Sequence, residues 1–453
     1  MLNKIEQYLF YFLLFAIPFQ IRKVLYYPDW IFSEWQAVSV YGTDILIIAL
    51  FIFWFWKTRF KTRLKTCFPY LTFKTHDYFL LAFVVIAAIS IKNSSAVYLS
   101  LFSFIKLIEF VLFYFYIKTY AVYRFDFLKS LLALIAGGVF QAIIAISQFL
   151  KQSSLGLWFL GESLIGPDMR GVAVFYNFVG EKVMRSYGTT PHPNILAAYL
   201  FIAIFAFYLV HLYYGFHHKK PSYFSRLDSS LVFLYIITLF AFLFTFSRVI
   251  IFLWVFSFSI RAILVLTKER FREKFFKISV NKIKLTQILL ASLLVVITFS
   301  ILYWPEATSR FAISSSDEAV QLRIYYAGES LKSGFNLFGI GIGNFVNWLK
   351  DVDPGLARRF YQPVHNIYLL IYTETGVLGA SAFILFLIFL IKDYISQTKL
   401  AKFYHISYLL VVLSFLFIGF FDHFLWTLQQ GMLMFWLVLG GLNPASLQAK
   451  VRG

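Results

Sequence analysis

The sequence predicts an all-α polytopic membrane protein with about twelve transmembrane helices. The first observation is composition: of 453 residues, 60% are hydrophobic and only 14% are charged. The mean hydropathy of +0.74 is far outside the range of soluble globular domains. The second observation is a series of apolar runs separated by polar segments, most of them close to the length that crosses a hydrocarbon core of about 30 Å.

These apolar runs define the expected helices in chain order. They lie near residues 5–22, 43–57, 77–92, 97–117, 128–150, 194–213, 229–246, 249–266, 285–303, 365–391, 404–421 and 424–441. The first run follows Lys4 and ends in AIPFQIRK without an A-x-A-like cleavage site, so we expect a retained span rather than a signal peptide. The only cysteine is Cys67, and no internal disulfide is expected.

Lysine and arginine indicate the orientation of these helices. The formal net charge is +19. If the N-terminus is cytoplasmic, many of the cations fall in cytoplasmic segments, at 57–74, 118–129, 219–226, 268–284 and 392–402. This asymmetry follows the positive-inside rule, so we expect both termini in the cytoplasm. The charge is then a property of topology, and no nucleic-acid partner is predicted.

The same orientation places two long segments outside. We expect a single integral membrane domain over residues 1–453, with an external loop at 151–193 and a large external loop containing helices at 304–364. Irregular backbone near a membrane is tolerated only where water or protein covers it, and such loops commonly hold functional residues. The candidate site is therefore expected on this side.

The first polar constellation is MRSYGTTPHPNILAAYL, residues 184–200. Arg185 precedes a turn, and Pro193 and Asn194 suit the start of a helix. A helix N-terminus with unpaired N–H groups attracts anions such as phosphate. The alternative is a capped turn at the membrane interface.

The second constellation is LFTFSRVIIFLWV, residues 243–255, where Ser247 and Arg248 interrupt a long apolar stretch. A guanidinium group presents a planar fork of donors that matches phosphate oxygens. Ionisable groups at membrane depth are functional candidates. The alternative is an arginine that extends to the interface from a tight external hairpin.

The third constellation is AVQLRIYYAGESLKSGFNLFGIGIGNF, residues 319–345. Arg323 and Glu329 lie on an expected external amphipathic helix, and a glycine-rich turn follows. Its glycines resemble a dinucleotide-binding fingerprint only loosely, because the third is misplaced and no βαβ unit surrounds them. We expect a turn that packs against the membrane domain.

The fourth constellation is YQPVHNIYLLIYTETGVLGA, residues 361–380. His365 lies at the expected outer end of a helix and is the histidine best placed for acid–base chemistry. The alternative is an interfacial histidine with Asn366 as the helix cap. Glu374 is nine residues farther on, about 13 Å along a helix, so we expect it to pair with another span. Lys106 and Glu109, spaced i, i+3, are expected to neutralise each other.

No metal or other cofactor is predicted. The DVD segment at 351–353 resembles the metal-binding motif of nucleotide-sugar glycosyltransferases, but it is short, common and placed outside, where nucleotide sugars are scarce. The eight histidines are scattered without metal-ligand spacing.

Together these segments resemble the O-antigen ligase and polymerase superfamily of bacterial envelope enzymes. The resemblance covers about residues 180–390 and rests on GTTPHPN after Arg185, TFSR ending in Arg248, Arg323 followed by GIGIGNF, and HNIYLLIYTETGVLG. The last segment, with its Glu-x-Gly-x-x-Gly pattern, is the most specific.

The resemblance implies a fold similar to C-type glycosyltransferases and an inverting, metal-independent transfer. Its members pass a glycan en bloc from undecaprenyl diphosphate to a hydroxyl acceptor, such as a lipid A core sugar or a growing glycan, at the outer face of the cytoplasmic (inner) membrane. By this resemblance Arg248 and Arg323 hold the diphosphate, and His365 assists the acceptor hydroxyl. The expected substrate-binding residues are Arg185, Asn194, Ser247 and Asn366.

Other functions remain open. Ligases, polymerases and O-linked oligosaccharyltransferases share these motifs, and the short segment after the last run favours a ligase or polymerase. A transporter for a lipid-linked glycan would also need many spans and basic groups. It predicts functional charges near the bilayer midplane and inverted repeats, whereas these candidates gather at the expected outer face.

Overall fold

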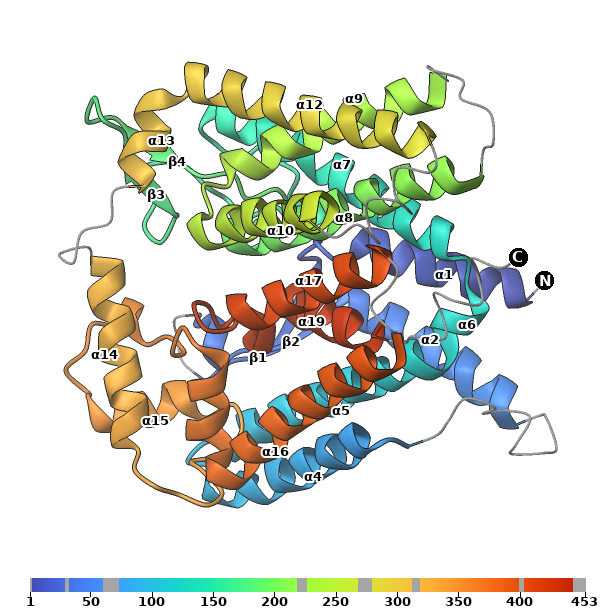
Figure 1. Cartoon of the computed structure of the whole chain (residues 1–453). Coiled ribbons are helices and arrows are strands. Elements are labelled where there is room, and N and C mark those ends of the chain that lie inside the picture. Colours follow the sequence, from blue (N-terminus) through green and yellow to red (C-terminus); the bar gives the residue numbers. More distant parts are fainter. Residues whose placement is uncertain are drawn as a thin grey trace. The chain divides into compact units, whose positions relative to one another are not determined.

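The computed structural model describes residues 2–28, 32–59, 73–217, 226–267, 279–311, 318–398 and 403–442 (Figure 1). Many of the cations that predict the orientation, and Cys67, lie outside these residues. The described part is mostly helical, and each predicted apolar run coincides with helix. The corresponding helices are α1 (Leu2–Ala16), α2 (Gly42–Arg59), α4 (Thr75–Ser90), α5 (Val97–Tyr116), α7 (Phe127–Lys151), α8 (Pro193–His217), α9 (Arg226–Phe244), α10 (Arg248–Thr267), α12 (Ser279–Leu302), α16 (Ile367–Thr398), α17 (Phe403–Ile418), and the pair α18 (Phe424–Thr427) and α19 (Gln429–Gly440).

Within the described residues, five helices are long and apolar enough to cross a membrane. They lie at Thr75–Asn93, Val97–Arg124, Phe127–Lys151, Pro193–His211 and Ile367–Thr398. A sixth candidate is formed by α12 and α13 (Trp304–Phe311), which bend by 93° at their junction. The count of twelve spans therefore stays a prediction. The last predicted run is divided because Leu428 is extended, with φ −116° and ψ 138°.

Two short antiparallel hairpins depart from the all-helical prediction. Strand β1 (Arg22–Tyr26) pairs with β2 (Val38–Tyr41), and β3 (Val174–Tyr176) pairs with β4 (Lys182–Met184). The expected first span, 5–22, extended to Arg22, the first residue of β1. Helix α1 ends earlier, at Ala16, because Pro18 cannot continue a helical hydrogen-bond pattern.

The predicted large loop at 304–364 contains helices, as expected. These are α13, α14 (Glu318–Lys332), α15 (Phe345–Val352) and the single turn η5 (Arg358–Phe360). Arg323 and Glu329 both lie on α14, where Glu329 pairs with Lys332 at 2.6 Å. The location of the loop at 304–364 outside the membrane stays a prediction.

The chain divides into two compact units. The first unit comprises Met1–Ile21, Phe125–Ile313 and Leu400–Ser414, and the second comprises Arg22–Arg124, Ser314–Lys399 and Phe415–Gly453. In the first unit α8 is central, and every residue from Ile195 to Ala206 is buried. Helices α7, α9, α10 and α12 pack against it. Gly138 permits the close approach of α7, since a Cβ there would lie 2.5 Å from the Ala203 Cβ.

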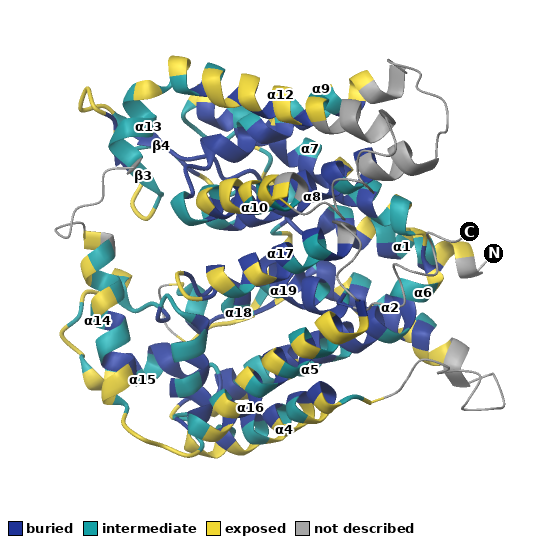
Figure 2. Ribbon diagram, in the orientation of Figure 1, coloured by how far each residue is buried: buried dark blue, intermediate teal, exposed yellow. Residues whose placement is uncertain are grey.

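The outer face of α12 is exposed and apolar (Figure 2). Its exposed apolar side chains are Leu289, Leu290, Leu293, Leu294, Val296, Ile297, Ile301 and Leu302. A continuous apolar helix face without a protein partner is suited to contact with lipid. This pattern agrees with an integral membrane protein.

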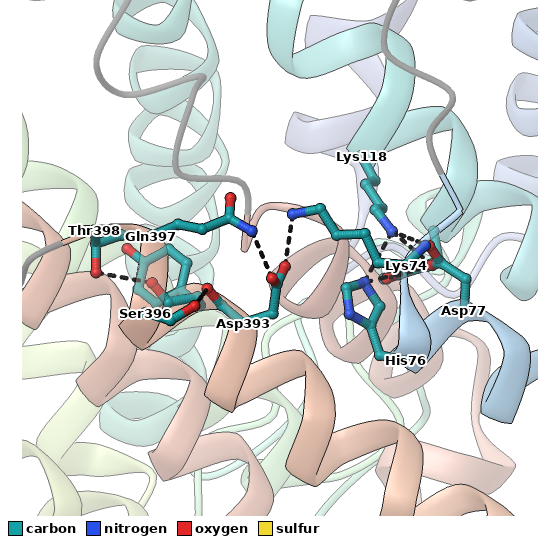
Figure 3. A network of polar contacts seen from close by, with 10 residues as sticks. Lys74, His76, Asp77, Lys118, Asp393, Ser396, Gln397 and Thr398 are labelled. Atoms are coloured by element: carbon teal, nitrogen blue, oxygen red, sulfur yellow. Dashed lines mark hydrogen bonds and ion pairs between the residues drawn. The ribbon is translucent and has the colours of Figure 1, made fainter.

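In the second unit α4 and α16 pack along their length, and α5 packs against α19. Charged side chains join their ends: Figure 3 shows Lys118 directed at Asp77 and His76, and Lys74 directed at Asp393. The Lys118–Asp77 and Lys74–Asp393 pairs are each 2.6 Å long. The Lys118–Asp77 pair is largely buried, and buried charges are tolerated when they are paired in this way, whereas Lys74 and Asp393 are partly exposed.

Candidate functional site

His365 lies directly before α16 and contacts rings from two other segments. The Tyr326 ring of α14 stacks on the imidazole at 6.0 Å between centroids, with an interplanar angle of 16°. His423, at the start of α18, packs edge-on at 4.9 Å. The Nδ1 atom of His365 is buried without a hydrogen-bond partner among the described residues. A buried ring nitrogen without a hydrogen-bond partner is unusual in a folded protein, and this makes His365 a candidate for function.

The surroundings of His365 favour its neutral form. Burial lowers the pKa of His365 below its usual value of 6.5; the Asp422 charge opposes this, and the Arg323 charge adds to it. The net direction is downward. The imidazole is therefore uncharged at neutral pH, which is the form that can accept a proton from a hydroxyl.

Tyr326 forms a fixed wall of this cluster. Its side chain is fully buried and its hydroxyl donates to the Phe360 carbonyl. Burial raises the pKa of Tyr326 to about 12, so the ring stays neutral across the physiological range. It positions the imidazole without competing for the proton.

Asn366 caps α16. Its Oδ1 accepts hydrogen bonds from the backbone N–H groups of Tyr368 and Leu369, at 2.9 and 3.0 Å. The capping interpretation of Asn366 is therefore confirmed. Its expected contribution to substrate binding stays a prediction, since this oxygen is already engaged.

Helix α16 is interrupted at Gly376, which has φ 72° and ψ −173°. The glycine-rich turn fills the interruption. On one side the Ile340 and Gly341 N–H groups donate to the Thr373 and Glu374 carbonyls, both at 3.0 Å. On the other, the Val377 and Leu378 N–H groups donate to the carbonyls of residues 336 and 337, at 3.0 and 3.3 Å. The broken backbone is thus satisfied by protein, as a membrane environment requires.

The glycines are needed because the backbones approach closely here. A Cβ on Gly376 would lie 2.4 Å from the Leu337 carbonyl carbon, and one on Gly339 would lie 2.4 Å from the Glu374 carbonyl carbon. Both residues also have positive φ. The turn was expected to pack against the membrane domain, and it packs against α16, one of the helices long and apolar enough to cross a membrane.

The predicted partner of Glu374 was wrong. Glu374 is buried, and its Oε1 accepts from the Phe345 N–H at the start of α15, at 3.4 Å. Its partner is therefore a loop-helix N-terminus rather than another span, which places a carboxylate where unpaired N–H groups favour it. The Lys106–Glu109 pair is confirmed at 3.1 Å, and Lys106 also contacts Asp44 at 2.6 Å.

The DVD segment serves the structure. Asp353 accepts from the Tyr325 hydroxyl at 2.7 Å, and its carbonyl accepts from the Tyr361 hydroxyl at 2.8 Å. Among the residues that the structure describes, no group of three or more His, Cys, Asp or Glu side chains could hold a metal ion.

Four predicted site residues belong to the first unit, and three of them contact one another directly. Arg185 is buried and donates from Nε to the Thr245 carbonyl at 2.6 Å and from Nη2 to Asn194 Oδ1 at 2.7 Å. The Ser247 hydroxyl donates to the same Asn194 oxygen at 3.1 Å. Arg248 follows as the first residue of α10. The cluster thereby fixes the turn that precedes Arg248.

Sequence reasoning missed Arg310 in this unit. Its Nε donates to the Phe246 carbonyl at 3.4 Å, in the same turn that precedes Arg248. Phe246 itself has a positive φ of 45°, which is uncommon for a side chain of this size. The available signal was a basic residue near the start of the long loop at 304–364.

Three residues around His365 were also missed. Tyr326, Asp422 and His423 complete its cluster, and His423 Nδ1 lies 2.7 Å from the Thr427 hydroxyl. An Asp-His pair in the two-residue gap between the runs 404–421 and 424–441 could have identified two of them, since that gap is expected on the same side as His365.

Apolar helices of spanning length and a neutral histidine at a helix entrance define an integral membrane protein with a candidate acid–base site. Residues 233–384 match the family described as O-antigen ligase, and this match supports the resemblance to the O-antigen ligase and polymerase superfamily. The matched segment includes Ser247, Arg248, Arg323 and His365. No curated protein shows a significant sequence match.

Proposed function

We propose that this protein transfers a glycan en bloc from undecaprenyl diphosphate to a hydroxyl acceptor at the outer face of the bacterial cytoplasmic membrane, in the manner of an O-antigen ligase. The family match supports a glycosyltransferase-like enzyme that acts on lipid-linked glycans. The observation that carries the mechanism is His365: a neutral imidazole with an orphan nitrogen and a cation close by.

The proposed step is an inverting displacement. The acceptor oxygen bonds to the anomeric carbon as the bond from that carbon to the diphosphate oxygen breaks. The acceptor proton passes to His365, and the electron pair leaves with undecaprenyl diphosphate. A diphosphate is a stable anion and needs no general acid.

Arginines are proposed to hold the leaving group. Arg323 is close enough to His365 for its charge to be felt there, which suits a residue that binds the departing diphosphate in the second unit. Arg248, in the first unit, is proposed to bind phosphate oxygens, on a turn held by Arg185 and Asn194. Bidentate guanidinium–phosphate contacts supply fixed positive charge without a metal ion.

A polymerase of the same superfamily would perform this step with a second carrier-linked glycan as the acceptor. The test is a transfer assay with purified protein, a defined undecaprenyl-diphosphate glycan, and both lipid A core and carrier-linked glycan as acceptors. Product on lipid A core supports the ligase, and product on the second carrier indicates the polymerase. Movement of the lipid across vesicles without a new glycosidic bond would indicate a transporter.

Variants connect the assay to the residues. We expect His365→Ala to slow transfer about 10²- to 10⁴-fold, as for loss of a general base, with expression unchanged. Arg248→Ala and Arg323→Ala should each abolish transfer. Arg170→Ala is the matched control, because Arg170 is exposed on a surface loop. Normal transfer by the His365 and Arg248 variants would contradict the proposal.

A further inference from the structure

The second unit contains a cavity of about 130 Å³ that the proposed chemistry does not use. Its walls come from the β1–β2 hairpin, α5, the start of α15 and the α18–α19 segment. Aromatic rings form much of the lining, and they belong to Trp35, Tyr41, Phe102, Phe345, Trp426 and Trp436. An apolar cavity of about 150 Å³ accommodates one benzene ring, so this volume suits a single six-membered ring rather than an oligosaccharide.

The cations of the cavity are already neutralised. Arg22 donates to Glu34 through both terminal nitrogens, one of these contacts being 2.6 Å, and to the Tyr41 hydroxyl at 3.1 Å. Lys106 lies 2.6 Å from Asp44 and 3.1 Å from Gln429 Oε1. With each of these cations held by a carboxylate, the cavity offers no spare positive charge to a diphosphate.

Ser39 points to a ligand with hydroxyl groups. Its side chain is only 3% exposed, lines the cavity, and has no hydrogen-bond partner among the described residues. Side chains two apart on a strand face the same side, and Tyr41, two residues on, lines the cavity too. Burying an unpaired hydroxyl is costly unless something else completes its hydrogen bond.

The cavity lies one side chain away from His365. Trp35 and Thr427 both line it, and both contact His423, at 5.0 Å between ring centroids and 2.7 Å to the hydroxyl oxygen. His423 in turn packs on the His365 ring. A sugar ring seated here would be separated from the proposed base by the His423 side chain.

We propose that this cavity binds one uncharged sugar ring of the glycan acceptor, with a hydroxyl hydrogen-bonded to Ser39 and the ring faces against aromatic walls. The inference rests on the proposed function, because it assigns to that reaction the site of its acceptor. Aromatic faces suit the C–H surfaces of a sugar, and amide and carboxylate groups suit its hydroxyls. Because its two cations are paired with carboxylates, we do not expect this cavity to bind the diphosphate part of the donor.

The test measures acceptor and donor dependence separately. In Ser39→Ala the lost hydrogen bond should raise the acceptor KM about three- to tenfold while the donor KM stays the same. Ser39→Val also fills part of the cavity and should raise the acceptor KM further. Thermal stability should not fall in Ser39→Ala, since no protein partner loses a bond. A donor KM that rises instead, or an acceptor KM that does not change, overturns the inference.

Ser100→Ala is the matched control. Ser100 is a buried serine of α5 that donates to the Ser94 hydroxyl at 2.7 Å and does not line the cavity. It should lose stability and keep its acceptor KM. A rise in acceptor KM equal to that of Ser39→Ala would show a general packing effect and overturn the inference.

Binding without catalysis distinguishes this inference from the proposed function. Saturation-transfer NMR on the His365→Ala protein would use free glucose, galactose and N-acetylglucosamine as probes, with inorganic diphosphate as the anionic competitor. Sugar signals that Ser39→Val weakens and diphosphate leaves unchanged support the cavity even if no transfer is found. No sugar signal, or displacement by diphosphate at this cavity, overturns it even if transfer is normal.

Discussion

The charge state of His365 depends on three side chains that are distant in sequence. Tyr326 shields the ring from water, Arg323 disfavours the imidazolium, and Asp422 favours it. Because burial dominates, the pKa of His365 lies below 6.5. The imidazole therefore remains a competent base under mildly acidic conditions, where an exposed histidine is half protonated.

This predicts the pH dependence of transfer. The rate should fall on the acidic side as His365 is protonated, and the midpoint should lie below pH 6.5. Asp422→Asn removes the charge that raises the pKa, so the midpoint should move to lower pH. The measurement is kcat/KM against pH for both proteins. A midpoint unchanged by the substitution would contradict the assigned role of Asp422.

Arg185 commits donors of its guanidinium group to two partners within the protein, the Thr245 carbonyl and Asn194 Oδ1. In Arg185→Lys the charge remains but the two separate contacts to Thr245 and Asn194 cannot both form. We expect a loss of about 1–3 kcal/mol in the free energy of unfolding. Thermal unfolding in detergent measures it.

Lys182→Ala is the control for Arg185→Lys. Lys182 pairs at 3.3 Å with Asp168, which is almost fully exposed, so its loss should cost less than about 1 kcal/mol. If Arg185→Lys were as stable as Lys182→Ala while transfer was lost, Arg185 would bind substrate rather than hold the turn.

At the scale of elements, the Glu-x-Gly-x-x-Gly pattern has a structural explanation. Glu374 accepts a hydrogen bond from the N–H group of Phe345 at the start of α15. Gly376 interrupts the helical backbone of α16, and the glycine turn forms the backbone hydrogen bonds that the interruption leaves open. These hydrogen bonds attach the short helical segment that follows His365 to the loop at 336–343. The position of His365 therefore depends on this attachment.

Gly376→Ala tests this attachment of α16 to the loop at 336–343. The new Cβ meets the 336–337 backbone at 2.4 Å in a left-handed conformation, so we expect a loss of about 2 kcal/mol or more, with reduced transfer. Gly328→Ala is the matched control, because Gly328 is helical with open space around it. It should gain about 0.5–1 kcal/mol. Equal thermal stability of the two variants would refute the explanation.

For the whole molecule, the predicted orientation is testable with cysteine labelling. Phe178 and Phe335 are 82% and 79% exposed, and they lie in the segments expected outside. In a Cys67→Ser background, Phe178→Cys and Phe335→Cys should react with a membrane-impermeant maleimide in intact cells. Ser396→Cys, at the opposite end of α16, should react only after permeabilisation, as should native Cys67. The reverse pattern would invert the topology.

Much of the fold follows from the sequence alone. Helices occur at every predicted apolar run, because a long apolar chain in lipid must satisfy its own backbone hydrogen bonds. The capping role of Asn366 and the Lys106–Glu109 pair were also predictable, since each involves residues within one helical turn. His365, Arg323 and Arg248 could be proposed from the sequence as candidates, by residue type and flanking segments, and their roles stay predictions.

Tertiary structure alone decided the contacts between distant segments. The insertion of residues 336–343 into the break of α16, the packing of His423 on His365, and the contact of Arg185 with Thr245 each join residues far apart in the chain. No local periodicity specifies such contacts, because they depend on which helices pack together and at what depth. The neutral state of His365 belongs with these, since burial and neighbouring charges set it rather than the residue itself.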